Sequence, residues 1–206
     1  MIAAIVPAAG RSQRMGRPKL ILPVGGETVI ARVVAALVAG GAGPVLVVVP
    51  PASASGAIIL AEEAERAGAA VAVAPEHPAD MRASIELGIG RLDRGLAPDA
   101  VLIAPGDSLG ITPALVARVI EQRAKAEPRA IVVPVYRGRR GHPIALPWCL
   151  ATEVKSLPMG VGLNALVARH AADLVEFEVD EPGTVADLDT PEDYRHWTGG
   201  RRPMRS

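Results

Sequence analysis

The chain has 206 residues, a length that suits one α/β domain with a hydrophobic core of its own. Hydrophobic residues make up 50% of the chain but aromatic residues only 2%, so the core must be built from Ala, Val, Leu and Ile. The 22 basic residues balance the 22 acidic ones, and the formal net charge of zero argues against the general attraction to polyanions that is typical of nucleic-acid-binding proteins.

Cysteine content and hydropathy bear on the compartment. Cys149 is the only cysteine and cannot form an internal disulfide, which fits a reducing environment. No apolar run approaches the roughly 18 residues of a membrane-spanning helix. The apolar N-terminus lacks a preceding cationic region and is interrupted at Pro7, so it fits a first strand better than a signal peptide. We therefore expect a cytoplasmic protein that has neither a membrane nor a nucleic acid as its partner.

Apolar patterning predicts strands and helices that alternate along the chain. Short runs rich in β-branched residues predict strands at residues 2–6, 45–49, 71–74, 100–104, 131–135, 144–146 and 174–179. Helical periodicity and capping residues predict helices at residues 28–37, 53–67, 81–92, 113–126, 149–156 and 163–171, and a short helix from residue 191. This order indicates a mostly parallel sheet that is covered by helices on both faces. We expect one domain over residues 1–198 and a disordered tail at residues 199–206.

The loop that follows the first strand carries the strongest chemical signal. Residues 7–19 read PAAGRSQRMGRPK, in which small residues and glycines leave backbone amides unobstructed. Four cations stand in the same loop, at Arg11, Arg14, Arg17 and Lys19. Backbone donors and fixed cations after a first strand are suited to binding a polyanion such as a triphosphate. The alternative is an ordinary glycine-rich connection whose arginines are solvated.

Acidic residues and one histidine are further candidates. Asp107 directly follows a predicted strand, where it could either hold Mg²⁺ or act as a side-chain cap for the next helix. Asp187 and Asp189 precede a predicted helix, and taken alone they favour capping and helix-dipole effects over metal binding. His142 lies beside the basic turn at residues 137–141, where an anionic ligand and a structural role are equally consistent with the sequence.

Several familiar catalytic signatures are absent. The Walker pattern fails because Gly16 is followed by Arg-Pro rather than Lys-Ser or Lys-Thr, and no GxGxxG follows the first strand. The four histidines and the single cysteine form no zinc-ligand spacing, and there is no GxSxG nucleophile elbow. The sequence therefore argues against a P-loop NTPase, a dinucleotide-binding dehydrogenase and a zinc enzyme.

Four motifs, taken in their order along the chain, resemble the small nucleotidyltransferases that activate molybdenum cofactor, in particular the molybdenum cofactor cytidylyltransferases. The family pattern LAAGxSxRMGxPK followed by LLP is matched from Pro7 to Pro23, and its GDQPxxTP corresponds to Gly106 through Pro113. The runs GRRGHP and DxDTPEDY stand unchanged at residues 138–143 and 187–194. The resemblance covers about residues 1–196, and GRRGHP is the more discriminating motif.

The resemblance implies a Rossmann-like, three-layer nucleotidyltransferase fold with a mostly parallel mixed sheet. It also implies nucleotidyl transfer from CTP to the phosphate monoester of a molybdopterin-type acceptor, giving a cytosine dinucleotide cofactor and pyrophosphate. Mg²⁺ is the implied cofactor, held by Asp107 and Asp189, while Lys19, Arg14 and Asp107 serve catalysis. The implied nucleotide-binding residues are Ala8, Ala9, Gly10, Arg11, Ser12, Met15, Gly16, Met81, Ser84 and Gly106. The implied acceptor-binding residues are Arg139, Arg140 and His142, and the implied protein partner is a molybdoenzyme or its maturation chaperone.

Single positions bear on the choice of substrate. The cytidylyltransferases have AAG around the position of Ala9, whereas the guanylyltransferase relatives have AGG. A side chain at this position narrows the space beside the base, which suits a pyrimidine. Ser108-Leu109 departs from the Gln-Pro of GDQP, Asp80-Met81-Arg82 departs from the family's GMSSSL segment, and Ala74 aligns with a usual Asn. These departures leave three alternatives open: GTP as the donor, another phosphorylated acceptor, or a non-catalytic homologue that binds a nucleotide or cofactor.

Overall fold

A central sheet organises the fold. The computed structural model describes residues 1–94, 97–158 and 160–199, so the tail predicted at residues 199–206 lies, except for Gly199, outside the described residues. The strands of the sheet are β1 (Ile2–Pro7), β4 (Val45–Val49), β5 (Ala70–Val73), β6 (Ala100–Ile103), β7 (Ile131–Tyr136), β8 (Arg139–Arg140), β9 (Ile144–Pro147) and β10 (Leu174–Glu178). They lie in the order β10-β7-β9-β6-β1-β4-β5, and β8 pairs with β7. A separate hairpin is formed by β2 (Pro23–Val24) and β3 (Glu27–Thr28).

The sheet is mixed but mostly parallel. β1 runs parallel to β4 and β6, β4 to β5, and β10 to β7. β9 is antiparallel to both β6 and β7. Residues 137–143 connect β7 to β9, and this connection is too short for the parallel crossover, which needs a dozen residues or more. The predicted mixed sheet is therefore confirmed.

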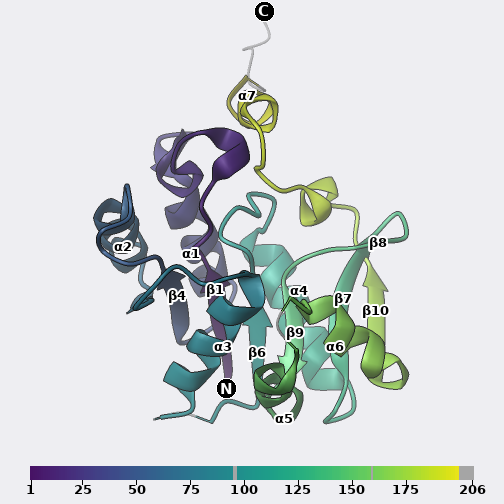
Figure 1. Cartoon of the computed structure of the whole chain (residues 1–206). Coiled ribbons are helices and arrows are strands. Elements are labelled where there is room, and N and C mark those ends of the chain that lie inside the picture. Colours follow the sequence, from purple (N-terminus) through teal and green to yellow (C-terminus); the bar gives the residue numbers. More distant parts are fainter. Residues whose placement is uncertain (95–96, 159, 200–206) are drawn as a thin grey trace, which may run out of the picture.

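Helices cover both faces of the sheet (Figure 1). One hydrophobic cluster contains residues of α1 (Val29–Ala39), α2 (Ala57–Arg66) and α4 (Pro113–Lys125). The other contains residues of α3 (Met81–Leu92), α5 (Trp148–Ala151) and α6 (Leu163–Arg169). The last helix, α7 (Pro191–Gly199), lies at the top of the view in Figure 1, beside the segment that follows β1. Among the described residues, no helix is both long and apolar enough to cross a membrane.

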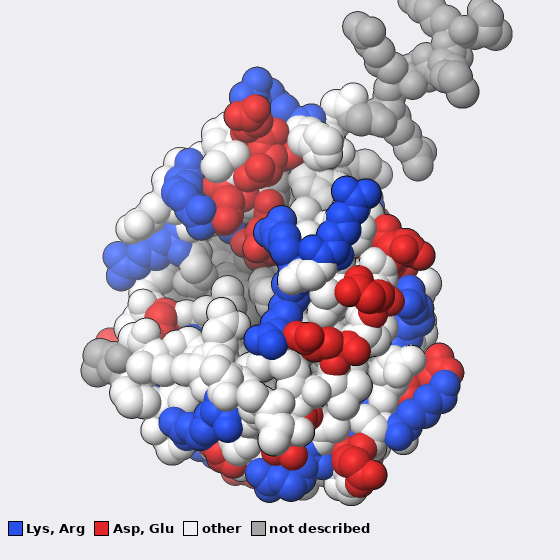
Figure 2. Space-filling model, turned by 90° about the vertical axis from the view of Figure 1, so that its right-hand side faces the viewer, with Lys and Arg blue, Asp and Glu red and all other residues white. Residues whose placement is uncertain are grey.

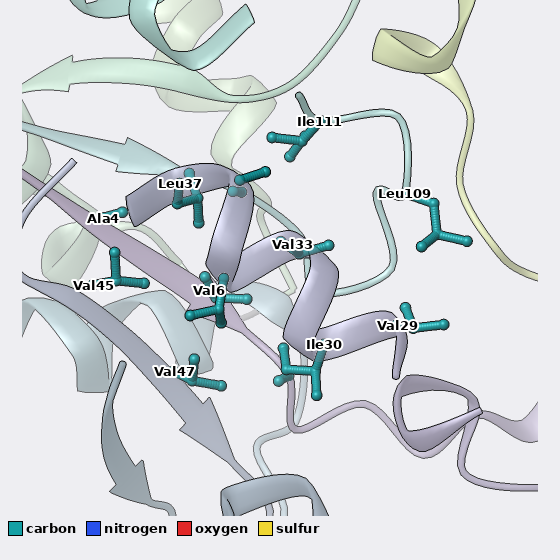
Figure 3. Close-up of a cluster of buried hydrophobic side chains, with 14 of the residues drawn as sticks. Ala4, Val6, Val29, Ile30, Val33, Leu37, Val45, Val47, Leu109 and Ile111 are labelled. Carbon is teal, nitrogen blue, oxygen red and sulfur yellow. The ribbon is translucent and has the colours of Figure 1, made fainter. Parts of the chain in front are cut away.

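The residues of β1 show why both faces must be covered. Ala4 and Val6 join the cluster that α1 completes with Ile30 (Figure 3), whereas Ala3 and Ile5 join the cluster on the α3 side. The four β1 side chains are 0% exposed. Because successive side chains of a strand point to opposite faces, a strand without polar residues needs apolar partners on both sides.

Local signals decide where the helices begin. Thr112 directly precedes α4 and caps it, since its side chain accepts a hydrogen bond from the Leu115 N–H at 3.1 Å. The helix predicted at residues 53–67 is shorter than expected and begins only at Ala57. The reason is Gly56, whose φ of 75° is left-handed and cannot belong to a right-handed helix.

Candidate functional site

A cleft of about 710 Å³ lies where the segments after β1 and β6 meet. This is the edge at which ligands collect in parallel α/β sheets. The sequence-predicted residues that line it are Ala8, Ala9, Gly10, Arg11, Ser12, Arg14, Lys19, Met81, Ser84, Gly106, Asp107, His142 and Asp189. On the face shown in Figure 2, basic and acidic side chains lie next to one another around a hollow.

The loop after β1 presents backbone donors to the cleft. The loop begins at Ala8, directly after β1, and the Ala8 N–H donates to the Val48 carbonyl at 2.9 Å. Ser12 then takes a left-handed conformation, with φ of 49°, and begins the 3-10 helix η1 (Gln13–Met15). Within the described residues, the N–H groups of residues 9–12 have no acceptor in the protein. Unpaired amides in a tight turn can form an anion-binding nest, and this loop presents such amides to the cleft.

Lys19 joins the two predicted metal ligands. Its Nζ donates to Asp107 Oδ2 at 2.5 Å and to Asp189 Oδ1 at 3.0 Å. The lysine side chain is only 15% exposed, compared with 17% for Asp107 and 30% for Asp189. Burial alone would lower the pKa of Lys19, but the charges and hydrogen bonds of the two carboxylates outweigh it, and the pKa is raised above 10.5. Lys19 is therefore a fixed cation.

Asp107 and Asp189 do not cap the helices that follow them. Thr112 caps α4, which leaves the Asp107 side chain to Lys19. At the start of α7, Thr190 Oγ1 accepts from the Asp193 N–H at 3.2 Å, and Asp193 Oδ2 accepts from the Thr190 N–H at 2.7 Å. This reciprocal capping box supplies the cap of α7, so Asp189 is free to face the cleft.

Backbone contacts bring the two acidic segments together. The Leu188 N–H donates to the Asp107 carbonyl at 3.2 Å, and the Leu188 side chain is 0% exposed. Leu188 thus anchors the chain in the core directly beside Asp189. Gly110 and Gly183 also touch, and a Cβ added to Gly110 would come within 2.1 Å of the Gly183 carbonyl oxygen. Only a pair of glycines allows this approach of two backbones.

The acidic pair fits a divalent cation that is completed by its substrate. The two Lys19 distances add up to 5.5 Å, which is the upper limit for the separation of Asp107 Oδ2 and Asp189 Oδ1. Two oxygens on one octahedral Mg²⁺ are about 3 Å apart when adjacent and about 4 Å apart when opposite, since each bond measures 2.0–2.1 Å. Among the described residues, no three His, Cys, Asp or Glu side chains are grouped to hold a metal. Magnesium with one or two carboxylates and substrate phosphates is a common arrangement, and the site suits it.

His142 and Asp187 line the cleft, and the buried Ser108 contacts Asp187. Ser108 is 1% exposed, and its Oγ donates to Asp187 Oδ1 at 3.1 Å. Burial lowers the pKa of His142 below 6.5, and the nearby charges of Asp187 and Asp107 oppose this shift without cancelling it. The imidazole is thus neutral at pH 7, so it can offer hydrogen bonds but no full positive charge.

Four of the sequence-predicted site residues lie outside this cleft. Met15 is 6% exposed and packs into the core on the α1 side. Gly16, with φ of 69°, ends η1 and lines an adjoining cavity of about 520 Å³. Arg139 and Arg140 form β8 and are exposed, and Arg140 Nε donates to Glu176 on β10 at 2.5 Å. The antiparallel pairing of β8 with β7 holds this turn at the end of β7, and neither arginine lines the cleft.

Two features of the cleft were not anticipated from the sequence. Asp80 caps α3 by accepting from the Ala83 N–H at 2.8 Å, so this departure from the family pattern has a structural role. His77 lines both the cleft and the adjoining cavity, and its buried Nδ1 has no hydrogen-bond partner within the described residues. The available signal was its position, since it follows β5 at the edge where the signature loop follows β1.

Solved structures share this fold. A nucleotidyl transferase from Methanothermobacter is 26% identical, with a TM-score of 0.80 over 97% of this chain and 96% of the other. Rv0371c from Mycobacterium tuberculosis is 25% identical, with a TM-score of 0.79 over 97% of each chain. A CTP complex of CMP:2-keto-3-deoxy-manno-octonic acid synthetase, at 13% identity and a TM-score of 0.72 over 96% of this chain and 97% of the other, shares the fold alone. A comparison with curated protein sequences gave no significant match.

The sequence model of the MobA-like NTP transferase domain matches residues 4–174. This span contains the signature loop, Lys19, Asp107 and His142, whereas Asp189 and α7 follow it. The chain belongs to the MobA-like NTP transferase family and is a nucleotidyltransferase.

Proposed function

We propose that this nucleotidyltransferase uses Mg²⁺ and CTP and transfers the cytidylyl group to a phosphate monoester of the molybdopterin type. The observation that carries the proposal is the Lys19 cluster, in which one buried cation and two carboxylates stand beneath a loop of free amides. A molybdoenzyme or its maturation chaperone would then receive the product.

The reaction needs positioning and charge more than covalent help. An oxygen of the acceptor phosphate attacks the α-phosphorus of CTP, the bond to the β-phosphate bridging oxygen breaks, and pyrophosphate leaves with that electron pair. The loop amides, Arg11 and Arg14 would bind the triphosphate, and Lys19 would offset charge on the leaving group. Asp107 and Asp189 would hold the cation, whose charge offsets that of the phosphoryl oxygens.

The nucleotide proposal rests on the walls around the loop. Ala9 is 4% exposed on the cleft wall, where its methyl group narrows the space beside a base. The Ser84 hydroxyl belongs to a residue that is only 3% exposed, on the α3 side of the cleft. A pyrimidine needs less room than a purine, which favours CTP. Among fold neighbours, one synthetase was solved with CTP and Rv0371c with manganese.

The acceptor side is formed by His142 and Asp187. A neutral imidazole and a carboxylate held by Ser108 favour an acceptor that carries hydrogen-bond donors next to its phosphate. A reduced pterin offers ring N–H groups of this kind. Because Ser108 replaces the Gln of the family pattern, a different phosphorylated acceptor is the alternative that the experiment must separate.

The test is pyrophosphate release with Mg²⁺ and each of CTP, GTP, ATP and UTP, with and without molybdopterin. We expect turnover with CTP that depends on the acceptor. Asp107→Asn should lower kcat by about 10²–10³, the range found for groups that stabilise transition-state charge. Asp180→Asn, which changes an exposed carboxylate outside the cleft, is the matched control and should retain full activity. Turnover with GTP alone would refute the pyrimidine assignment, and turnover only with another phosphate monoester would refute the pterin.

A further inference from the structure

We infer that Lys19 and the divalent cation compete for the same two carboxylate oxygens, so that the cation enters with the nucleotide and not before it. The inference rests on the proposed function, because it takes Asp107 and Asp189 as the metal ligands. It concerns the order of events at that site. Lys19 would act both as a substitute for the cation in the empty enzyme and as a phosphate ligand in the loaded one.

The geometry makes the two cations mutually exclusive. Lys19 Nζ lies 2.5 Å from Asp107 Oδ2 and 3.0 Å from Asp189 Oδ1, which is between the oxygens that would bind the metal. A Mg²⁺ bonded to both oxygens at 2.0–2.1 Å would occupy nearly the same point. The ammonium must therefore leave before the metal can bind both carboxylates.

A free metal ion gains little by displacing the lysine. The arginine Arg14 also reaches Asp189 Oδ1, with its Nη2 at 3.0 Å, so two protein cations already balance the two carboxylates. Within the described residues no third acidic or imidazole ligand is grouped with them. A metal ion that arrives alone would expel both cations in exchange for two protein bonds, and water would fill its other positions.

The triphosphate changes this balance. It supplies oxygen ligands to the metal and, at the same time, gives Lys19 and Arg14 new anionic partners. Lys19 can make the exchange without moving its backbone, because its N–H is held by Ser12 Oγ at 3.3 Å and only the flexible four-carbon stem must swing. Each ligand thus makes binding of the other more favourable, and linkage requires the two effects to be equal.

The experiment measures Mn²⁺ binding to the purified full chain without any nucleotide, by the loss of the free Mn²⁺ signal in electron paramagnetic resonance. Lys19→Met removes the competing charge and should bind Mn²⁺ at least about tenfold more tightly than wild type, equivalent to about 1.4 kcal/mol. Lys19→Arg keeps a cation and should bind as weakly as wild type. Lys155→Met is the matched control, since Lys155 pairs with Asp93 at 3.2 Å outside the cleft, and it should change nothing.

Further arms make each outcome decisive. Asp189→Asn in the Lys19→Met background should abolish the gain, which assigns the bound Mn²⁺ to this pair. A CTP analogue with a methylene group between the α- and β-phosphorus should increase Mn²⁺ binding to wild type beyond what the analogue binds in solution, and should do so much less for Lys19→Met. Equal Mn²⁺ affinity of wild type and Lys19→Met would overturn the inference. Because no turnover is measured, this result is separate from the substrate test above.

Discussion

Two glycines of α3 provide a matched pair for testing how the helix positions the cleft. Gly88 and Gly90 both lie inside the helix, and neither has a positive φ. A Cβ added to Gly88 would lie 2.8 Å from Cγ2 and 3.1 Å from Cδ1 of Ile5, a fully buried residue of β1. A Cβ added to Gly90 would have no atom within 4 Å. The two substitutions to alanine therefore differ in packing but not in helix propensity.

The magnitudes follow from these distances. Alanine is favoured over glycine inside a helix by about 1 kcal/mol, so Gly90→Ala should raise the free energy of unfolding by up to that amount. Gly88→Ala gains the same propensity, but a contact of 2.8 Å in a packed core costs about 1–3 kcal/mol. The difference between the two variants should be about 1–3 kcal/mol, with Gly88→Ala the less stable.

The assay is urea unfolding with linear extrapolation. Because Met81 and Ser84 of the same helix line the cleft, Gly88→Ala should also raise the KM for the nucleotide, whereas Gly90→Ala should not. Ile5→Ala should cost less in the Gly88→Ala background than in wild type, since it removes the clashing atoms. Equal stability of the two glycine variants would refute the packing argument.

Three further changes test individual side chains. Burial lowers the pKa of His142, so the neutral form contributes its full share to the free energy of unfolding above pH 6.5. That share is lost as the pH falls through the lower pKa of the folded state. Between about pH 7.5 and about pH 5, the free energy of unfolding in urea should therefore fall more for wild type than for His142→Gln. His77→Ala should raise the KM for the nucleotide about tenfold while His77→Asn retains most of the affinity, because the unpaired Nδ1 is available to the ligand; an unchanged KM in the alanine variant would contradict this role. Tyr194→Phe removes the 2.7 Å hydrogen bond to the Pro23 carbonyl and should lower the free energy of unfolding by about 1 kcal/mol, measured by thermal unfolding; a change of zero would show that the bond is fully replaced by water.

Much of the fold could be predicted because its signals are local. Continuous apolar runs rich in β-branched residues located every strand of the main sheet except the two-residue β8, and apolar residues with a period of 3.6 located the helices. Errors arose where one residue overrode the pattern, as Gly56 did at the start of α2. The direction of the Met15 side chain could not be predicted either, since a residue of the signature loop can face either a ligand or the core. The turn of η1 directs it to the core.

The sequence by itself indicated the alternating strands and helices of a mostly parallel sheet, the glycine-rich cationic loop and the motifs of a nucleotidyltransferase, because each is recognised from neighbours within a few residues. Only the tertiary structure decided that Lys19 meets Asp107 and Asp189, which lie 88 and 170 positions away. It also decided that Asp107 and Asp189 face the cleft and do not cap α4 and α7, since Thr112 and Thr190 take that role. The physical reason is that a shared ion pair depends on the distance in space between segments that are far apart in the chain, which chain packing sets and local sequence does not encode.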